Sequence, residues 1–306
     1  MIAGLLILAV GGGLAWSLPS ATPGAAQAKP LQVLLIPADG GTESGTLADY
    51  QPVFNAVSRT TGLNFKLRVA QSYGAVVEGM CNGWADIAFV GPTTYLQAKE
   101  RGCADLLAVA VKDGQSVYYS GLFARGDAPF KGISDLRGKR IAFGDINSTS
   151  SFVFPMTMLI DAGIDPAKDL GEVRMTGSHA NSLAALLQGR VDVAALSFDS
   201  YEKAVRANVP GARALKVIAR SDPIPYPPLV VNSKLAPETR TRLQVAFQDI
   251  AHAPGVTPEM IRGYGGAQVD GYDAHFPAAK FVPAAQKMAM VSDALKSEIL
   301  RKSAER

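Results

Sequence analysis

The sequence predicts an α/β fold of two lobes that the chain joins twice. From residue 31 onward, short apolar runs alternate with segments of helical periodicity, which indicates βαβ units and mostly parallel sheets flanked by helices. The same pattern starts again after the turn-rich segment 126–138. Segments near 118–125 and 218–231 join the two cycles, so we expect two lobes connected by a two-segment hinge.

The first cycle supplies the strands and helices of the first lobe. We expect strands at residues 31–38, 64–70, 85–91 and 105–111, and helices at residues 47–62, 73–84 and 92–102. Gly62 closes the first helix, and Pro92 lies in the first turn of the third, where the missing N–H costs nothing. We expect the segment 117–126 to be a hairpin-like partner of the strand at 105–111.

The second cycle supplies the second lobe and leads into a helical tail. We expect strands at residues 139–145, 170–178, 191–197 and 214–221, and helices at residues 150–163, 180–190 and 201–208. The Pro residues of 222–235 exclude a regular helix there, and the polar tail from Pro237 should pack back on the first lobe. The predicted division is a leader at 1–28, the first part of lobe one at 29–121, lobe two at 122–220, and a return crossover with C-terminal helices at 221–306.

Composition bounds the class of partner. The 306 residues are 48% hydrophobic and 19% charged, which is ample for a sizeable core. The formal net charge is +3, and the Lys and Arg residues are scattered rather than arranged in a basic stripe. We therefore expect no nucleic-acid partner, and a small anion is favoured over a polyanion.

The N-terminus has the pattern of a secretory signal peptide. An apolar stretch at residues 2–18 is followed by small residues that end in Ala26-Gln27-Ala28, before Lys29. We expect cleavage after residue 28 and a periplasmic location. Because no Lys or Arg precedes the apolar stretch, a late start of the given sequence and an uncleaved anchor are the alternatives.

Two cysteines, Cys81 and Cys103, follow helices that end on the same edge of the predicted sheet. In an exported protein a single disulfide between them is the favoured interpretation. The alternative is a thiol pair that binds a soft metal or metalloid, although no His or third Cys gives it the spacing of a metal site.

The stretch Gly144–Pro155, "GDINSTSSFVFP", places four hydroxyl side chains directly before a helix. One Ser or Thr suffices to cap a helix, so four exceed that need. Ser148, Thr149 and Ser150, together with the unpaired N–H groups of the first helical turn, could bind an oxyanion at the positive end of the helix dipole. An ordinary helix cap is the alternative.

Two further polar residues follow strands of the second lobe. His179 stands where the strand at 170–178 hands over to a helix, and its imidazole could donate to an oxyanion. Asp199 follows the strand at 191–197, where its carboxylate could accept a proton from a monoprotonated oxyanion; a helix cap is the alternative.

Three segments, 69–98, 144–155 and 177–202, resemble the periplasmic phosphonate, phosphite and phosphate binding proteins of ABC importers, in the family's order and spacing. The resemblance implies the two-lobed type II fold of periplasmic binding proteins. It implies that Ser148, Thr149, Ser150 and His179 bind the ligand, that Tyr73 reaches it from the first lobe, and that Asp199 faces the cleft. Tyr95, early in its helix, would line the same opening.

Two departures from the family pattern affect the expected ligand. A tyrosine of the family is replaced by Val90, and an acidic residue that pairs with the ligand's amine is absent from "IPYPPLVV", where Tyr226, Pro227 and Pro228 stand. Both changes favour phosphite, phosphate or a small alkylphosphonate over an aminated ligand.

The expected function is capture of a small phosphorus oxyanion and its delivery to an ABC permease in the inner membrane, by a monomer with no cofactor, metal site or catalytic residues. A ligand sensor for a membrane histidine kinase is one alternative, for which Cys103 would be the only supporting feature. A Ser/His/Asp hydrolase is the other, since Ser148 or Ser150, His179 and Asp199 supply the residue types; the sequence has no G-x-S-x-G motif.

Overall fold

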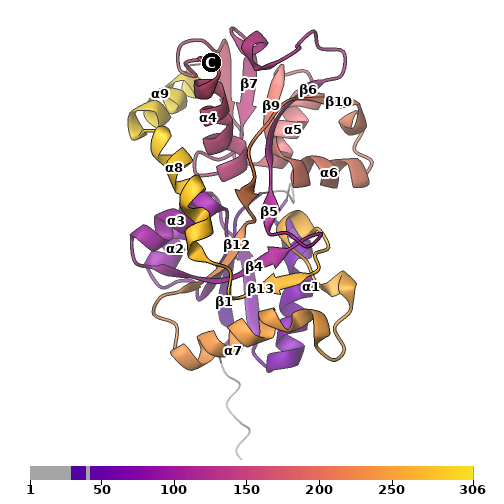
Figure 1. The fold of residues 1–306 in the computed structure, drawn as a ribbon, viewed down its shortest axis with the longest axis vertical. Helices are drawn as coiled ribbons and strands as arrows, with labels where there is room; N and C mark the ends of the chain where they lie inside the picture. Colours follow the sequence, from indigo (N-terminus) through magenta and orange to yellow (C-terminus); the bar gives the residue numbers. More distant parts are fainter. Residues whose placement is uncertain (1–28, 39–41, 306) are drawn as a thin grey trace, which may run out of the picture.

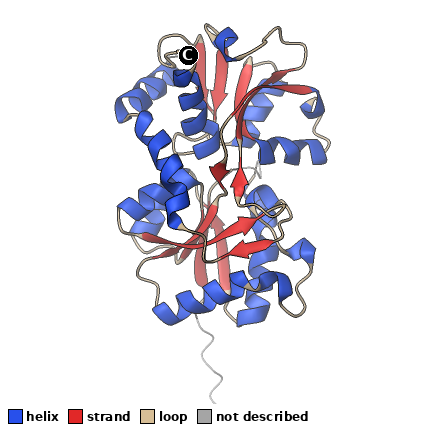
Figure 2. Ribbon diagram, in the orientation of Figure 1, coloured by secondary structure: helices blue, strands red, loops and turns tan. Residues whose placement is uncertain are grey.

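The computed structural model describes residues 29–38 and 42–305, which form two lobes, each built on its own β-sheet with helices around it (Figures 1 and 2). The α/β class and the two-lobed plan are confirmed. The expected signal peptide lies outside the described residues.

The sheet of the first lobe has six strands in the order β13-β4-β12-β3-β1-β2. β1 pairs in parallel with β2 and with β3, whereas β12 runs antiparallel to both of its neighbours and β13 antiparallel to β4. The strands are β1 (Leu31–Leu35), β2 (Phe65–Val69), β3 (Ile87–Phe89), β4 (Ala104–Val111), β12 (Pro228–Asn232) and β13 (Gly271–Asp273). Strands β1 to β4 therefore run in one direction. β12, which the chain forms after it returns from the second lobe, lies between β3 and β4 and runs in the opposite direction.

The sheet of the second lobe has five strands in the order β10-β6-β9-β7-β8. β7 pairs in parallel with β8 and β9, whereas β6 runs antiparallel to both β9 and β10. The strands are β6 (Ser120–Arg125), β7 (Arg140–Phe143), β8 (Glu172–Met175), β9 (Val193–Ser197) and β10 (Leu215–Arg220). In each lobe, therefore, the first strand that the chain forms after crossing between the lobes, β6 or β12, runs antiparallel to its neighbours.

The two crossings between the lobes lie side by side. β5 (Val117–Tyr118) and β11 (Ile224–Pro225) form a two-stranded antiparallel sheet between the lobes, where Figure 1 shows β5. The Ser120 N–H donates to Ser221 Oγ at 3.0 Å where the crossings enter the second lobe. The expected hairpin of 117–126 with 105–111 is wrong, because β6 finds its partners in the second sheet while β4 pairs with β12 and β13.

Helices follow the strands closely enough that their first turns lie at the strand ends. The first lobe has α1 (Glu43–Thr61), α2 (Tyr73–Cys81), α3 (Pro92–Glu100) and α7 (Pro237–Gln248). The second lobe has a π-helical turn η2 (Thr149–Val153) that continues into α4 (Phe154–Asp161), then α5 (His179–Leu187) and α6 (Phe198–Arg206). Gly62 ends α1 in the left-handed conformation at φ 68°, as its position predicted.

The C-terminal helices do not all pack on the first lobe. α7 lies under the first sheet, but α8 (Val282–Met290) contacts both α3 and α4, and α9 (Asp293–Ala304) packs against β8 in the second lobe (Figure 1). The Met175 N–H donates to Ser303 Oγ at 3.1 Å, and Lys302 Nζ donates to the Ala167 carbonyl at 2.8 Å. The expectation that the whole tail packs on the first lobe is therefore wrong for α9, whose polar surface meets the backbone of the second lobe. Besides the crossings at β5 and β11, the chain thus passes between the lobes a third time at α8, which the expected two-segment hinge did not include.

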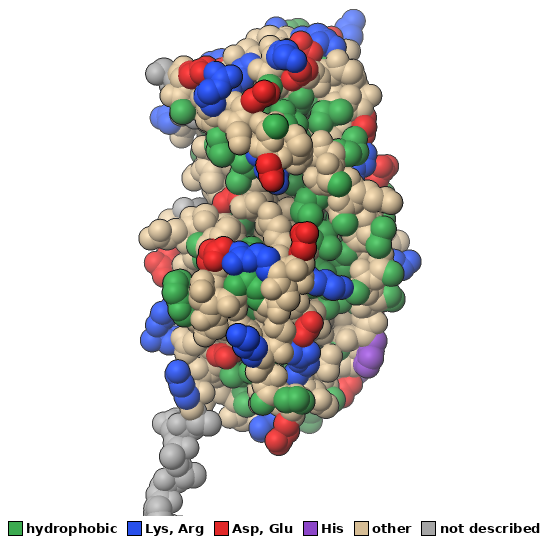
Figure 3. Space-filling view, turned by 90° about the vertical axis from the view of Figure 1, so that its left-hand side faces the viewer, with side chains coloured by type: hydrophobic (Ala, Val, Ile, Leu, Met, Phe, Trp, Pro, Cys, Tyr) green, Lys and Arg blue, Asp and Glu red, His purple; other side chains and the backbone are tan. Residues whose placement is uncertain are grey.

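The surface shown in Figure 3 carries Lys and Arg side chains interspersed with Asp and Glu. This mixture of basic and acidic side chains on the face shown agrees with the scattered Lys and Arg residues of the sequence. Among residues 29–38 and 42–305, no helix combines the length and apolar character that crossing a bilayer requires.

Cys81 and Cys103 form a disulfide that joins the end of α2 to the residue before β4, with a Cα–Cα distance of 4.8 Å. The bridge closes a loop over 22 positions that contains β3 and α3. It uses both cysteines of the chain, which leaves no thiol to bind a metal or metalloid.

We expect reduction of this bridge to lower the free energy of unfolding by about 2–4 kcal/mol, because the unfolded chain regains the freedom of the loop. Urea unfolding with and without dithiothreitol measures the difference. The matched control is the Cys81→Ala, Cys103→Ala double variant, whose midpoint should not respond to the reductant. Equal midpoints for the oxidised and reduced wild-type protein would contradict the prediction.

Candidate functional site

Helix N-termini from both lobes face one another across the interlobe boundary. In the first lobe α2 follows β2 and α3 follows β3, and in the second lobe η2, α5 and α6 follow β7, β8 and β9. Each of these helices starts near the carboxyl end of a strand, where ligands bind in open α/β sheets. Because the N-terminus of a helix presents unpaired N–H groups and a partial positive charge, this arrangement suits an anion.

Serine side chains cap four of these helices from within their own lobes. Each Ser Oγ accepts from the N–H three residues later, at 3.0 to 3.2 Å; the caps are Ser72 for α2, Ser148 for η2, Ser178 for α5 and Ser197 for α6. Ser148 is therefore a helix cap, which was the alternative for this hydroxyl. An N-cap of this kind leaves the earlier N–H groups of Thr149 and Ser150 without an intrahelical acceptor.

Thr149 caps a helix of the opposite lobe. α3 begins after Gly91, which has no side chain to act as a cap. Thr149 Oγ1 accepts from the Thr93 N–H at 2.8 Å and lies 3.0 Å from Thr93 Oγ1, to which it donates. The Thr149 hydroxyl is therefore engaged with the first lobe in this structure.

Asp145 forms the corresponding contact with α2. Its Oδ2 accepts from the Tyr73 N–H at 3.1 Å, and its Oδ1 accepts from the Asn147 N–H at 2.8 Å. Burial raises the pKa of the Asp145 carboxyl, and these two backbone hydrogen bonds oppose that rise. Gln97 of α3 donates to Asn147 Oδ1 at 2.9 Å, so the segment that precedes η2 touches both helices of the first lobe.

Ser150 and Ser151 take different directions. Ser150 is 2% exposed, and its carbonyl accepts from Ser120 Oγ at 2.7 Å, which ties η2 to the start of β6. Ser151 is fully buried, and its Oγ lies against Gly144, so closely that a Cβ at position 144 would overlap it. Ser151 therefore packs inside the second lobe, whereas Ser150 stands at the second position of η2.

His179 is 1% exposed and touches both lobes. Its Nδ1 accepts from the Ser197 N–H at 3.1 Å, so the neutral ring carries its proton on Nε2 and can donate from that side. The His179 backbone N–H donates to the Ala38 carbonyl of the first lobe at 3.2 Å. The ring stands edge-on to Tyr264 with 6.1 Å between centroids.

Asp199 is 5% exposed and forms an ion pair across the lobes. Its Oδ1 lies 2.9 Å from Nζ of Lys112, which follows β4 in the first lobe, and accepts from the Tyr226 hydroxyl at 3.3 Å. Burial and the nearby Asp199 charge hold the pKa of Tyr226 well above its usual range, so the phenol stays protonated. The sequence had not indicated Lys112 as a partner of this carboxylate.

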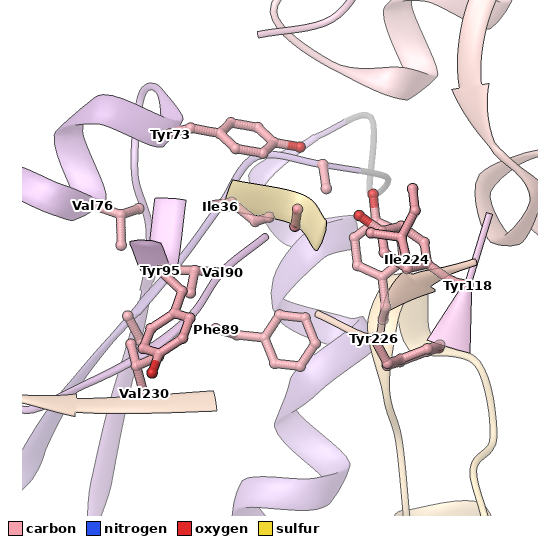
Figure 4. Packing of buried hydrophobic residues seen from close by; sticks show 14 of the residues in the cluster. Ile36, Tyr73, Val76, Phe89, Val90, Tyr95, Tyr118, Ile224, Tyr226 and Val230 are labelled. Carbon is pink, nitrogen blue, oxygen red and sulfur yellow. The ribbon is translucent and has the colours of Figure 1, made fainter. Parts of the chain in front are cut away.

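Tyrosines line the first-lobe side of the boundary. Figure 4 shows the hydroxyl of Tyr73 directed to the side where the hydroxyls of Tyr118 and Tyr226 lie. Tyr118 packs edge-on against Tyr226 and Tyr264, with centroids 5.9 and 5.8 Å apart. Tyr118, Tyr226 and Tyr264 were not predicted; Tyr118 and Tyr226 belong to the two crossings, and Tyr264 to the tail, which sequence reasoning did not bring together.

Tyr95 does not join this group. Its ring packs edge-on against Phe281 at 4.9 Å between centroids, and Lys99 Nζ lies 5.6 Å from the ring. In Figure 4 its hydroxyl points away from that of Tyr73. The expectation that Tyr95 lines the opening is not met, because α3 turns this residue towards the C-terminal segment while Thr93 faces η2.

Comparison with known proteins gives the family. A family model described as "ABC transporter, phosphonate, periplasmic substrate-binding protein" matches residues 41–275. The Phosphate-import protein PhnD of Mycolicibacterium smegmatis is 29% identical over 255 residues, which cover 79% of this chain and 78% of that protein. The Phosphonates-binding periplasmic protein of Escherichia coli is 28% identical over 210 residues, which cover 67% of this chain and 62% of that protein.

A solved structure agrees with the fold. The binding protein component of an ABC phosphonate transporter from Pseudomonas aeruginosa superposes with a TM-score of 0.76 at 23% identity, covering 90% of this chain and 95% of that one. The family match spans most of the chain and includes the residues that follow β2, β7, β8 and β9. The chain therefore belongs to the family of periplasmic substrate-binding proteins of ABC phosphonate transporters.

Proposed function

We propose that this protein captures a small phosphorus oxyanion, namely phosphate, phosphite or a small alkylphosphonate, between its lobes and delivers it to an ABC permease of the inner membrane. The observation that carries the proposal is the meeting of helix N-termini from both lobes at one buried place, through Asp145 with Tyr73 and Thr149 with Thr93. The relatives named as phosphate-import and phosphonates-binding proteins support the choice of a phosphorus oxyanion. We further propose that residues 1–28 export the chain and that it acts as a monomer.

The donors offered to the oxyanion are neutral groups. The N–H groups of Thr149 and Ser150 stand at the start of η2, and the Ser150 hydroxyl and His179 Nε2–H add side-chain donors. Tyr73 completes the set from the first lobe. Hydrogen bonds to an ionised acceptor contribute more than neutral ones, so a few such donors suffice without a full counter-charge.

Closure of the lobes and capture of the ligand are coupled in this proposal. The contacts of Asp145 with α2 and of Thr149 with α3 exist only when the lobes meet. A ligand that bridges η2 and Tyr73 favours the same closed form, and the populations shift towards it. The closed form is then the one that the permease would recognise.

The contacts of the site do not support a hydrolase. Ser148 Oγ accepts from the Ser151 N–H as a helix cap, and His179 Nδ1 accepts from the Ser197 N–H. A catalytic triad requires Nδ1 to donate to a carboxylate, whereas Asp199 bonds Lys112 and Tyr226. The cysteine-based sensor is likewise disfavoured, because Cys103 is bridged to Cys81.

We expect Ser150→Ala to weaken binding of the phosphorus oxyanion by about 1–3 kcal/mol, because the anion loses one donor in a buried site. Calorimetry with phosphate, phosphite, methylphosphonate and arsenite, first on the wild-type protein, identifies the ligand and measures the loss. Thr157→Val is the matched control, since the buried Thr157 hydroxyl donates to the Phe154 carbonyl within α4, and the affinity of this variant should equal that of the wild type. A wild-type protein that binds none of the phosphorus oxyanions would overturn the proposed function.

We expect Asp145→Ala to destabilise the closed form, because the Tyr73 N–H loses its acceptor from the other lobe. In the ligand-bound protein, the Tyr73 amide should exchange its hydrogen faster, and ligand affinity should fall by about tenfold or more. Asp165→Ala is the control, because Asp165 Oδ1 accepts from the Ala167 N–H in the same local geometry, entirely within the second lobe. Equal effects of the two substitutions would mean that Asp145 acts only within its own lobe.

A further inference from the structure

We propose that Lys112 supplies a built-in ammonium partner for Asp199, so that phosphonates carrying an amine are excluded while unaminated ones are accepted. The inference rests on the proposed function and deepens it, because it assigns a specificity-determining residue to the same site. It begins from the ion pair of Lys112 with Asp199 at the interlobe boundary.

The Asp199 carboxylate lies at the same strand end as the group that holds His179. It stands two residues after Ser197, whose N–H holds His179, and it bonds Tyr226 of the second crossing. The Tyr226 ring packs on Tyr118, which packs on Tyr264 beside His179. A chain of direct contacts thus connects Asp199 to the imidazole that we assign to the oxyanion.

A carboxylate at this position needs a cation. Asp199 is 5% exposed, and removing an ionised group from water is costly unless it is paired and hydrogen-bonded. Lys112 Nζ meets this need at 2.9 Å, and the Tyr226 hydroxyl adds a second donor at 3.3 Å. Burial lowers the pKa of Lys112, but the charges and hydrogen bonds of Asp199 and Glu202 together raise it more, so the ammonium stays charged.

The pair has two consequences for a ligand. Lys112 compensates the Asp199 charge and also contacts Glu202 Oε2 at 3.4 Å, so an oxyanion at Ser150 and His179 does not face an uncompensated Asp199 carboxylate. It also places a fixed ammonium on this buried carboxylate, and a ligand amine brought to the same oxygen would be repelled by that ammonium. An aminated phosphonate would therefore have to displace Lys112 before it could bind Asp199.

The chain provides a matched ion pair that crosses the same boundary. Lys203 of α6 lies 2.5 Å from Asp49 of α1, and the side chain of Lys203 is 27% exposed against 24% for Lys112. Both lysines join α6 to the first lobe, and Lys112 also contacts Glu202 of α6 at 3.4 Å, so removing Lys203 controls for the loss of a lysine that bridges the lobes. Only the Lys112 pair involves the carboxylate that is bonded to Tyr226.

The test compares aminomethylphosphonate with ethylphosphonate, which replaces the amine by a methyl group of similar size, on wild-type protein and on the Lys112→Met and Lys203→Met variants. Phosphate is titrated on each protein as well. We expect Lys112→Met to improve the ratio of the two dissociation constants at least tenfold in favour of the aminated ligand, and Lys203→Met to leave that ratio near the wild-type value.

Two further variants keep the test independent of general damage. Lys112→Arg should retain the exclusion, since it keeps a cation beside Asp199, and the double variant Lys112→Met, Asp199→Asn should lose any gain for the amine. If Lys112→Met is too unstable to titrate, a larger thermal shift with aminomethylphosphonate than with ethylphosphonate supports the same conclusion. If Lys112→Met binds phosphate but shows the wild-type ratio of dissociation constants, or the wild-type difference in thermal shift, this inference is overturned and the proposed function stands. If the wild-type protein binds no phosphorus oxyanion, both are overturned.

Discussion

The structure depends on helices of the first lobe whose N–H groups are capped by side chains of the second. Ser72 caps α2 locally but accepts from Ala75, and the Tyr73 N–H bonds Asp145 of the other lobe. α3 starts at a glycine cap, and Thr149 supplies the acceptor that this cap lacks. Since buried N–H groups require partners, meeting of the lobes completes the ends of these helices as well as enclosing the space between them.

The same constraint explains why the stretch Gly144–Pro155 carries more polar side chains than one helix cap needs. Ser148 caps its own helix, and the Val153 N–H bonds the Ser148 carbonyl in a π-helical turn. Asp145 and Thr149 serve the first lobe, and Ser151 packs inside the second. None of these tasks uses the side chain of Ser150, which stands at the second position of η2, and the proposed donor set therefore begins with it.

The sequence predicted the α/β class and the two crossings from local patterns, because the alternation of apolar runs and helical periods is a local property. The sheet order was not predictable in the same way. β6 and β12 pair with strands that lie far away in the chain, and no local signal reports which sheet receives them. The packing of α9 on β8 was not predicted either, because this contact also joins segments that lie far apart in the chain.

The site residues show where local reasoning stops. Ser148, Thr149 and His179 were predicted as ligand residues because strand-to-helix junctions are visible in the sequence. The contacts that each of them makes depend also on how the two lobes meet. Tyr73 and Tyr95 both lie in first turns, but Tyr95 comes two positions after Thr93, which is about 200° further around the helix. With Thr93 fixed against Thr149, Tyr95 must face the other way, and it meets Phe281.

The electrostatics of the boundary follow from how its carboxylates are occupied. Asp145 is held by two backbone N–H groups and Asp199 by Lys112 and Tyr226, so both carboxylates that stand near the proposed seat already have donors. The groups left to attract an anion are then the helix N-termini and the neutral donors Ser150 and His179. A site of this kind selects its ligand by the number and direction of its hydrogen-bond donors. A free ammonium would attract any anion, but the ammonium of Lys112 is already paired with Asp199. Discrimination among oxyanions is therefore set by how many ionised ligand oxygens can accept from these donors, whereas discrimination against a ligand amine is the part that we assign to Lys112.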